Sequence, residues 1–120
     1  MPFKGILAEL VSDELGVCSA ILADWEGEAV DWLSSGRCAE DIKLFGAHLG
    51  IVLNQMCRIA VAADSGDVQE IAIRMYGADW FVFPITSEYY LAVAAAHRGQ
   101  RAKICHIAQR CVERLRVEVG

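Results

Sequence analysis

The sequence predicts an α/β protein in which a five-stranded, mostly antiparallel sheet is covered by helices on both faces. Hydrophobic periodicity gives the element order helix, two strands, helix, three strands, helix. The strands are short and are joined mainly by turns typical of hairpins, which favours antiparallel pairing. Because three amphipathic helices each need an apolar surface to cover, both faces of the sheet must be buried. The layers are therefore α/β/α.

Length and composition indicate one globular domain over residues 1–120. The chain is 55% hydrophobic and 22% charged, which excludes a disordered chain and is more apolar than a typical soluble domain. We therefore expect part of the apolar excess to lie at an interface with another protein. The net charge of -5 argues against nucleic acid as the main partner.

Neither a membrane span nor a secretion signal is expected. Arg58 and Asp64 bracket the long apolar segment in the middle of the chain, so no uninterrupted apolar run reaches about 18 residues. Glu9, Asp13 and Glu14 stand where a signal peptide would have its apolar core and cleavage site. We expect a cytoplasmic protein without direct membrane insertion.

The first helix is expected to begin at Pro2 and to end at Gly16. Its apolar residues recur at steps of three and four, namely Phe3, Ile6, Leu7, Leu10 and Val11. An apolar run over residues 17–23 then predicts a buried central strand. Asp24 and Gly27 supply turn chemistry, so the run over residues 29–33 is expected to pair with it as a hairpin.

A long helix is expected from residue 38 or 39 to about residue 63. Glu40 and Asp41 fall in its first turn, where carboxylates complement the helix dipole. One stripe at alternating steps of three and four predicts the side that faces the core. It consists of Ile42, Phe45, Leu49, Val52, Met56, Ile59 and Ala63.

Three strands and a last helix complete the chain. Ile71, Ile73 and Met75 alternate with more polar residues, which predicts a strand buried on one face. Residues 80–86 and 89–96 predict two further strands. The last helix, from residue 100 to about residue 117, has a basic outer face. Its inward residues are predicted to be Ile104, Ala108, Cys111, Val112 and Leu115.

No motif for catalysis, for a metal or for a cofactor is found. The five cysteines, Cys18, Cys38, Cys57, Cys105 and Cys111, are odd in number and scattered, so we expect buried, reduced thiols. The three histidines, His48, His97 and His106, have no cysteine or carboxylate at a convincing ligand spacing. The Gly-x-x-x-x-Gly-Lys run of a P-loop is absent. A binding protein is therefore expected rather than an enzyme.

Three segments carry a resemblance to a known family. They are "GVCSAILADWEGEAV", the long glycine-bearing helix, and "VQEIAIRMYGADWFVFPITSEYYLAVAA". Together they resemble the Roadblock / dynein light chain domain, whose fold is similar to that of profilin and longin domains. The resemblance implies strand order 2-1-5-4-3, with the long helix on one face of the sheet and the first and last helices on the other.

The resemblance also implies partners. Members of the family are dimers that pair their long helices and extend the sheet through the third strand. Bacterial and archaeal members resemble regulators or scaffolds of small Ras-like GTPases, including activators of GTP hydrolysis, whereas eukaryotic members occur in dynein light chains and lysosomal scaffolds. The expected function is a dimeric GTPase regulator. A structural light chain without effect on nucleotide turnover is the alternative.

The long helix contains two interior glycines, which are unfavourable in a helix unless close packing requires them. Gly46 and Gly50 share a flank with Leu53 and Cys57, about a quarter turn from the core stripe. The flank could pack against the chain's own sheet or against a second copy of the helix. We favour the second copy because the core stripe already covers the sheet. With sheet extension, the predicted dimer interface is Gly46, Gly50, Leu53, Cys57, Ile71 and Ile73.

A third protein is expected to touch a different side of the same helix. Leu44, Ala47 and Ile51 share this side with Arg58, although ordinary exposed residues would give the same pattern. Arg58 and Arg74 could in principle reach a GTPase site as arginine fingers. Trp25, at the predicted hairpin tip, either docks a partner or folds back on its own hairpin.

Overall fold

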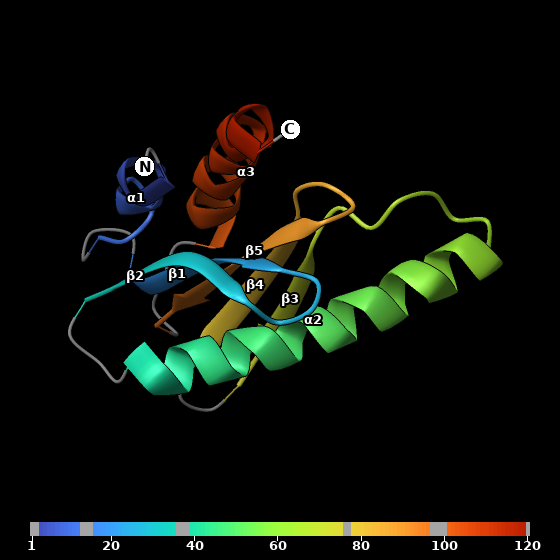
Figure 1. The fold of residues 1–120 in the computed structure, drawn as a ribbon, viewed down its shortest axis with the longest axis horizontal. Helices are drawn as coiled ribbons and strands as arrows, with labels where there is room; N and C mark the ends of the chain where they lie inside the picture. Colours follow the sequence, from blue (N-terminus) through green and yellow to red (C-terminus); the bar gives the residue numbers. More distant parts are fainter. Residues whose placement is uncertain (1–2, 13–15, 36–38, 76–77, 97–100, 120) are drawn as a thin grey trace.

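An antiparallel sheet in the order β2-β1-β5-β4-β3 forms the middle layer of the protein, which is seen here as a computed structural model (Figure 1). The structure describes residues 3–12, 16–35, 39–75, 78–96 and 101–119, without the side chains of 39–43. The elements are α1 (Phe3–Ala8), β1 (Val17–Asp24), β2 (Ala29–Ser34), α2 (Ala39–Ala62), β3 (Ile71–Arg74), β4 (Asp79–Pro84), β5 (Tyr89–Ala95) and α3 (Arg101–Val119). Helices α1 and α3 cover one face and α2 covers the other, which confirms the predicted layers and strand order.

Each face of the sheet has its own apolar core. Along β1, Ala20 and Leu22 pack toward α1 and α3, whereas Ile21 and Ala23 pack toward α2. The three inner strands, β1, β5 and β4, are therefore apolar at nearly every position, because neither of their faces meets water. The five residues predicted to face inward from α3 are all buried. The amphipathic pattern of α3 is confirmed.

The first helix is shorter than predicted. Helix α1 ends at Ala8, and the chain turns until Ser12 pairs with Val17 in an isolated bridge. The apolar pattern continued beyond the helix because Leu10 is fully buried although it lies in the turn. Gly16 has a φ of 76°, so it serves the entry into β1 rather than the end of a helix. Pro2 lies outside the described residues.

The predicted core stripe of α2 is wrong in its second half. Val52, Met56 and Ile59 are exposed, Ile59 by 58%. Leu53, which was assigned to the glycine flank, is instead fully buried against the sheet. The helix is thus rotated about its axis relative to the prediction. Only Leu49 of the stripe is buried, while Phe45 is partly buried and the side chain of Ile42 lies outside the described part of the structure.

Close packing at two glycines explains this rotation. A Cβ added at Gly46 would lie 3.1 Å from a methyl group of Ile21, and one added at Gly50 would lie 2.8 Å from the hydroxyl oxygen of Tyr90. Gly46, Gly50 and Leu53 therefore face the chain's own sheet and cannot also contact a second copy. Their assignment to the dimer interface is corrected. Cys57 is partly buried and packs at the margin of the same core.

Tyr90 of β5 fixes α2 to the sheet. Its side chain is fully buried, and its hydroxyl donates a hydrogen bond to the carbonyl oxygen of Gly46. The Trp25 ring meets the Tyr90 ring edge to face, with centroids 6.0 Å apart, and the indole N–H donates to the Thr86 carbonyl at 3.2 Å. Trp25 therefore packs onto β5 and the turn between β4 and β5, rather than onto its own hairpin as predicted.

Helix α2 also extends beyond the sheet. After Leu53 no residue of the helix is buried, and its C-terminal half projects past the strand ends (Figure 1). By length and composition the segment Leu44–Ala62 is apolar enough to cross a membrane. We had expected no such segment, because Arg58 interrupts the apolar run. Leu49 and Leu53 are nevertheless buried on the sheet, as in the core helix of a globular protein.

Substitution of Gly50 by alanine tests the close contact. The new Cβ cannot fit beside Tyr90 without a shift of the helix, so we expect the free energy of unfolding to fall by about 1–3 kcal/mol in urea denaturation. Gly5→Ala in α1 is the matched control, because a Cβ there meets nothing within 4 Å. The control should be neutral or more stable by up to about 1 kcal/mol. Equal stability of the two variants would refute the contact.

Alkaline pH should weaken the same contact. Burial raises the pKa of Tyr90 from 10.0 to about 12, so above pH 10 the unfolded chain loses this proton before the folded chain does. At neutral pH the wild type should exceed Tyr90→Phe by about 0.5–1.5 kcal/mol, the value of the hydrogen bond. Urea denaturation should show this advantage shrinking between pH 10 and pH 12. A constant difference would contradict the burial of the phenol.

Candidate functional site

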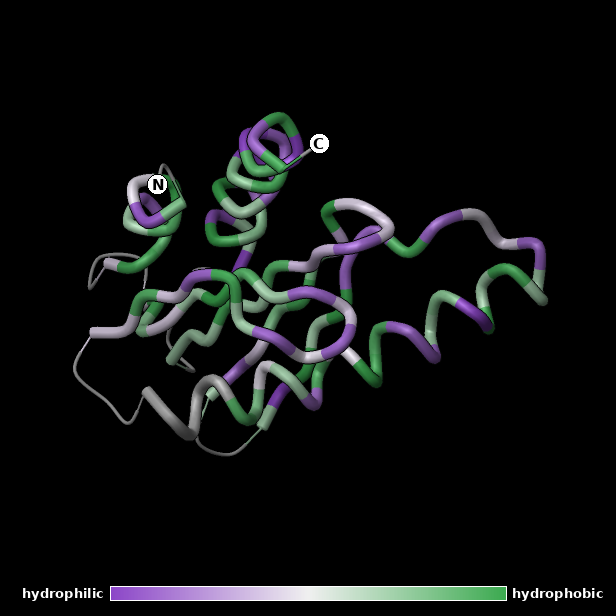
Figure 2. Tube along the Cα trace, in the orientation of Figure 1, coloured by the Kyte–Doolittle hydropathy of each residue, from purple (hydrophilic) through white to green (hydrophobic). Residues whose placement is uncertain are grey.

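The side of α2 that points away from the sheet is apolar and uncovered. We define this outer face by Leu44, Ile51, Val52, Met56 and Ile59, of which Leu44 is 62% and Ile51 59% exposed. Figure 2 shows apolar and polar segments alternating along α2, with apolar segments also in the part of the helix that projects from the sheet. His48 and Gln55 are also exposed on this side, but several large apolar residues gathered on one exposed helix side are typical of a protein interaction site.

The outer face has two sides, which contacts of neighbouring residues orient. The Phe45 ring packs against Trp80 of β4 with centroids 4.7 Å apart, so the helix side with Phe45 lies toward β4 and β3. Helical periodicity places Val52, Met56 and Ile59 on this side. We call these three residues the β3 side of the outer face.

The other side lies toward the hairpin of β1 and β2. Ala47 packs against the turn at Gly27, where an added Cβ would lie 3.2 Å from the Ala47 methyl group. Leu44, Ile51 and Arg58 follow Ala47 around the helix, and all three are exposed. We call them the hairpin side. The structure thus brings together the predicted partner residues but leaves little of Ala47 available for contact.

Strand β3 is an open edge of the sheet. It pairs with β4 from Ile71 to Arg74 and ends the strand order. Ile71 and Ile73 are partly buried on the α2 face, whereas Ala72 and Arg74 are exposed. An open edge offers backbone donors and acceptors to another strand. At the other edge, β2 has α1 beside it, and the Lys4 ammonium donates to the Trp32 carbonyl at 3.1 Å.

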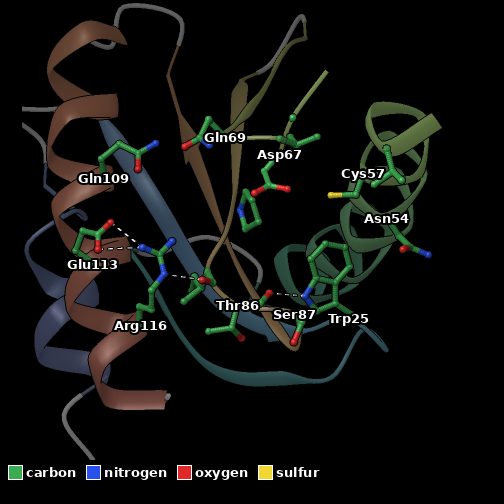
Figure 3. A pocket seen from close by; sticks show the side chains of 15 residues that line it. Trp25, Asn54, Cys57, Asp67, Gln69, Thr86, Ser87, Gln109, Glu113 and Arg116 are labelled. Carbon is green, nitrogen blue, oxygen red and sulfur yellow. Dashed lines mark hydrogen bonds and ion pairs between the residues drawn. The ribbon is translucent and has the colours of Figure 1, made fainter. Parts of the chain in front are cut away.

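A groove of about 770 Å³ lies at the end of the sheet, between the last turns of α2 and the second half of α3 (Figure 3). We call it the end groove. Trp25 and the turn between β4 and β5 form its floor. Arg116 donates to the Ile85 carbonyl at 2.8 Å and to the Glu113 carboxylate at 2.7 and 2.9 Å, so these two charges neutralise each other. The carboxylate of Asp67 makes no ion pair within the described chain.

Three of the thiols have raised pKa values. Burial is the main cause that raises the pKa of Cys105 and of Cys111 to about 11, so both remain protonated at neutral pH and are weak nucleophiles. Burial and then the negative charge of Asp67 also raise the pKa of Cys57. Within the described residues no group of His, Cys, Asp and Glu side chains could hold a metal ion. Cys38 and His97 lie outside them.

The two arginines predicted as possible arginine fingers differ in whether a carboxylate lies beside them. Arg74 lies 3.9 Å from the carboxylate of Asp79, which is also 3.8 Å from Arg101. Arg58 is exposed on the hairpin side of α2. Of the two, Arg58 is the more available to a partner.

The sequence did not reveal the end groove, because its walls come from four separated segments whose polar residues form no motif.

Comparisons with solved structures identify the fold. No family model matches the sequence, and no curated protein is significantly similar to it. A Roadblock/LC7 domain from Streptomyces avermitilis superposes with a TM-score of 0.84 at 19% identity, covering 96% of this chain and 95% of that one. A structure of MglB with a tetrameric arrangement gives a TM-score of 0.84 at 15% identity, with coverage of 95% and 85%.

Profilin is a more distant structural relative. Profilin IA from Acanthamoeba castellanii has a TM-score of 0.62 at 13% identity, and the match covers 98% of this chain and 99% of profilin. The chain therefore has the Roadblock/LC7 fold, which is similar to that of profilin. The fold expected from the resemblance is confirmed.

The proximity of Asp67 and Cys57 can be tested by alkylation. Asp67→Asn removes a negative charge that raises the pKa of Cys57, so more thiolate should form and iodoacetamide should label Cys57 faster at pH 8. Mass spectrometry of the digested protein would give the rate at this one cysteine. Asp64→Asn, a neighbouring substitution with the same charge change, should leave the rate unchanged. An equal effect of both variants would contradict the groove geometry.

Proposed function

We propose that the chain is a non-enzymatic, cytoplasmic, dimeric regulator or scaffold that binds a small Ras-like GTPase. The observation that carries the proposal is the apolar outer face, left uncovered on α2 in a protein with the Roadblock/LC7 fold. A large uncovered apolar surface indicates a protein partner. Within the described residues no reactive thiol or metal-ligand group competes with this interpretation.

The dimer in this proposal uses the β3 side of the outer face. The open edge of β3 can pair with β3 of a second copy, which would extend the sheet. Ile71 and Ile73 would then lie beside Val52, Met56 and Ile59, since both groups are on the α2 face of the sheet. The similar MglB structure has a tetrameric arrangement, which supports self-association of this fold.

The hairpin side is then left for the GTPase. Leu44 and Ile51 supply apolar contact, Arg58 supplies a positive charge, and Ala47 lies at the margin. Any acceleration of GTP hydrolysis would come mainly from positioning the GTPase's own residues. A finger role for Arg58 is less favoured because α2 is a rigid helix, and for Arg74 because Asp79 holds its guanidinium.

The proposed dimer is tested by Ile59→Glu. A carboxylate on the β3 side would be buried without a partner in the dimer, so light scattering should show a monomer of 13.2 kDa. Val117→Glu is the matched control, because Val117 is 80% exposed on α3, on the opposite face of the sheet. This control should remain a dimer. A dimeric Ile59→Glu variant would contradict the proposed interface.

GTPase binding is tested with the Ras-like GTPases of the source organism. We expect the wild-type protein to retain at least one of them in a pull-down that compares the GTP-loaded and GDP-loaded forms. Ile51→Glu should weaken binding at least about tenfold while the dimer persists. Failure to bind any such GTPase, together with unchanged hydrolysis rates, would refute the proposal.

The alternative is a structural light chain or assembly subunit. It would use the same outer face to hold a larger complex together without any effect on nucleotide turnover. Binding of a GTPase in both nucleotide states with no change in hydrolysis would favour this alternative. A motor or scaffold subunit encoded beside the gene would also favour it.

A further inference from the structure

The end groove contains polar groups that neither the fold nor the proposed function uses. Gln69 comes from the segment before β3 and Gln109 comes from α3, and in Figure 3 their carboxamides extend toward one another across the groove. Neither side chain makes a hydrogen bond within the described chain. Asp67, between them and α2, likewise has no ion pair. We propose that the end groove binds an extended peptide segment of a partner protein that carries one basic side chain.

The two carboxamides fit a peptide backbone. Each presents an N–H donor and a carbonyl acceptor, the same two groups that every peptide bond offers in complementary form. An extended chain that reaches both Gln69 and Gln109 could form hydrogen bonds with each of them. Further along α3 the groove is lined by Arg116, which only donates hydrogen bonds, and by Glu113, which only accepts them; these two side chains pair with each other.

The charge of the groove selects a basic residue. Arg116 cancels Glu113, which leaves Asp67 as the one uncompensated charge among the lining residues. A lysine or arginine of the peptide would pair with it, while the apolar surfaces of Trp25 and Val61 would receive the aliphatic part of that side chain. An acidic peptide would instead meet unfavourable charge.

The form of the groove favours a segment of a protein over a free small molecule. Its volume lies within the range of about 300–1,000 Å³ for ligand sites, but such sites bury most of their ligand. Here Asp67, Gln69 and Ser87 are exposed at the rim, so a ligand would remain partly in water. A segment anchored in a larger partner tolerates this because its other contacts add affinity.

The site is separate from the proposed dimer and GTPase surfaces. Its α2 residues, Asn54, Cys57 and Val61, lie on the flank of the helix near Trp25 rather than on the outer face. Asn54 lies one helical turn from Ile51 and from Arg58, so the groove adjoins the hairpin side but shares no residue with it. Failure of the wild-type protein to bind any GTPase would leave this proposal intact, so the two proposals fail independently.

Selection from a random seven-residue peptide library displayed on phage tests the proposal. With the immobilised wild-type protein we expect enrichment of peptides that share one lysine or arginine at a fixed position. A synthetic peptide of the enriched sequence should change the fluorescence of the protein on titration, through Trp25. Its affinity should fall at least tenfold for Asp67→Asn and for Gln109→Ala.

Asp64→Asn is the matched control and should bind the peptide as the wild type does. All three variants should keep the wild-type melting temperature within a few degrees, which separates loss of the site from loss of the fold. The proposal is overturned if no sequence is enriched, if the enriched peptides lack a basic residue, or if either Asp67→Asn or Gln109→Ala binds them with unchanged affinity.

Discussion

The close contact between α2 and the sheet at Gly46 and Gly50 determines the rest of the structure. A side chain at Gly50 would overlap the Tyr90 hydroxyl, and one at Gly46 would press against the Ile21 side chain. The hydrogen bond from Tyr90 to the Gly46 carbonyl then fixes the helix in one rotation about its axis. That rotation decides which side chains of an almost uniformly apolar helix are buried and which meet water.

The surfaces available for function follow from this rotation. With Leu49 and Leu53 buried, the remaining large apolar residues of α2 must point outward, although exposure of such residues to water is unfavourable. The β3 side of the outer face lies beside an open strand edge, so a second copy could cover both at once. The projection of α2 past the strands also forms one wall of the end groove. The packing of α2 at the two glycines thus determines the position of both the outer face and the end groove.

The sequence was sufficient for the fold because its strands are buried on one or both faces and carry clear patterns. The order of elements, the sheet and the inward face of α3 are as predicted. The rotation of α2 about its axis was not predicted. The helix has two apolar stripes, and periodicity alone does not show which of them faces the sheet. The glycine contacts decide between them, and they depend on Tyr90, about 40 residues further along the chain. Only the structure shows that pairing.

Other parts were beyond sequence reasoning for related reasons. Leu10 is buried from a turn, so the apolar pattern of the first helix extends beyond the end of that helix. Trp25 packs against the Tyr90 ring and also lines the end groove, so its two predicted roles do not exclude each other. The end groove joins four segments that are distant in the sequence, and its carboxamides become informative only when they are seen to face one another without partners.

The most direct test asks which side of α2 meets a second copy. In a mixed sample of ¹³C-methyl-labelled and unlabelled chains, isotope-filtered NOE spectra detect only contacts between copies. We predict intermolecular NOEs at the methyl groups of Met56, Val52 and Ile59, and none at Leu53. Intermolecular NOEs at Leu53, or none at the β3 side in a sample shown to be dimeric, would contradict the account.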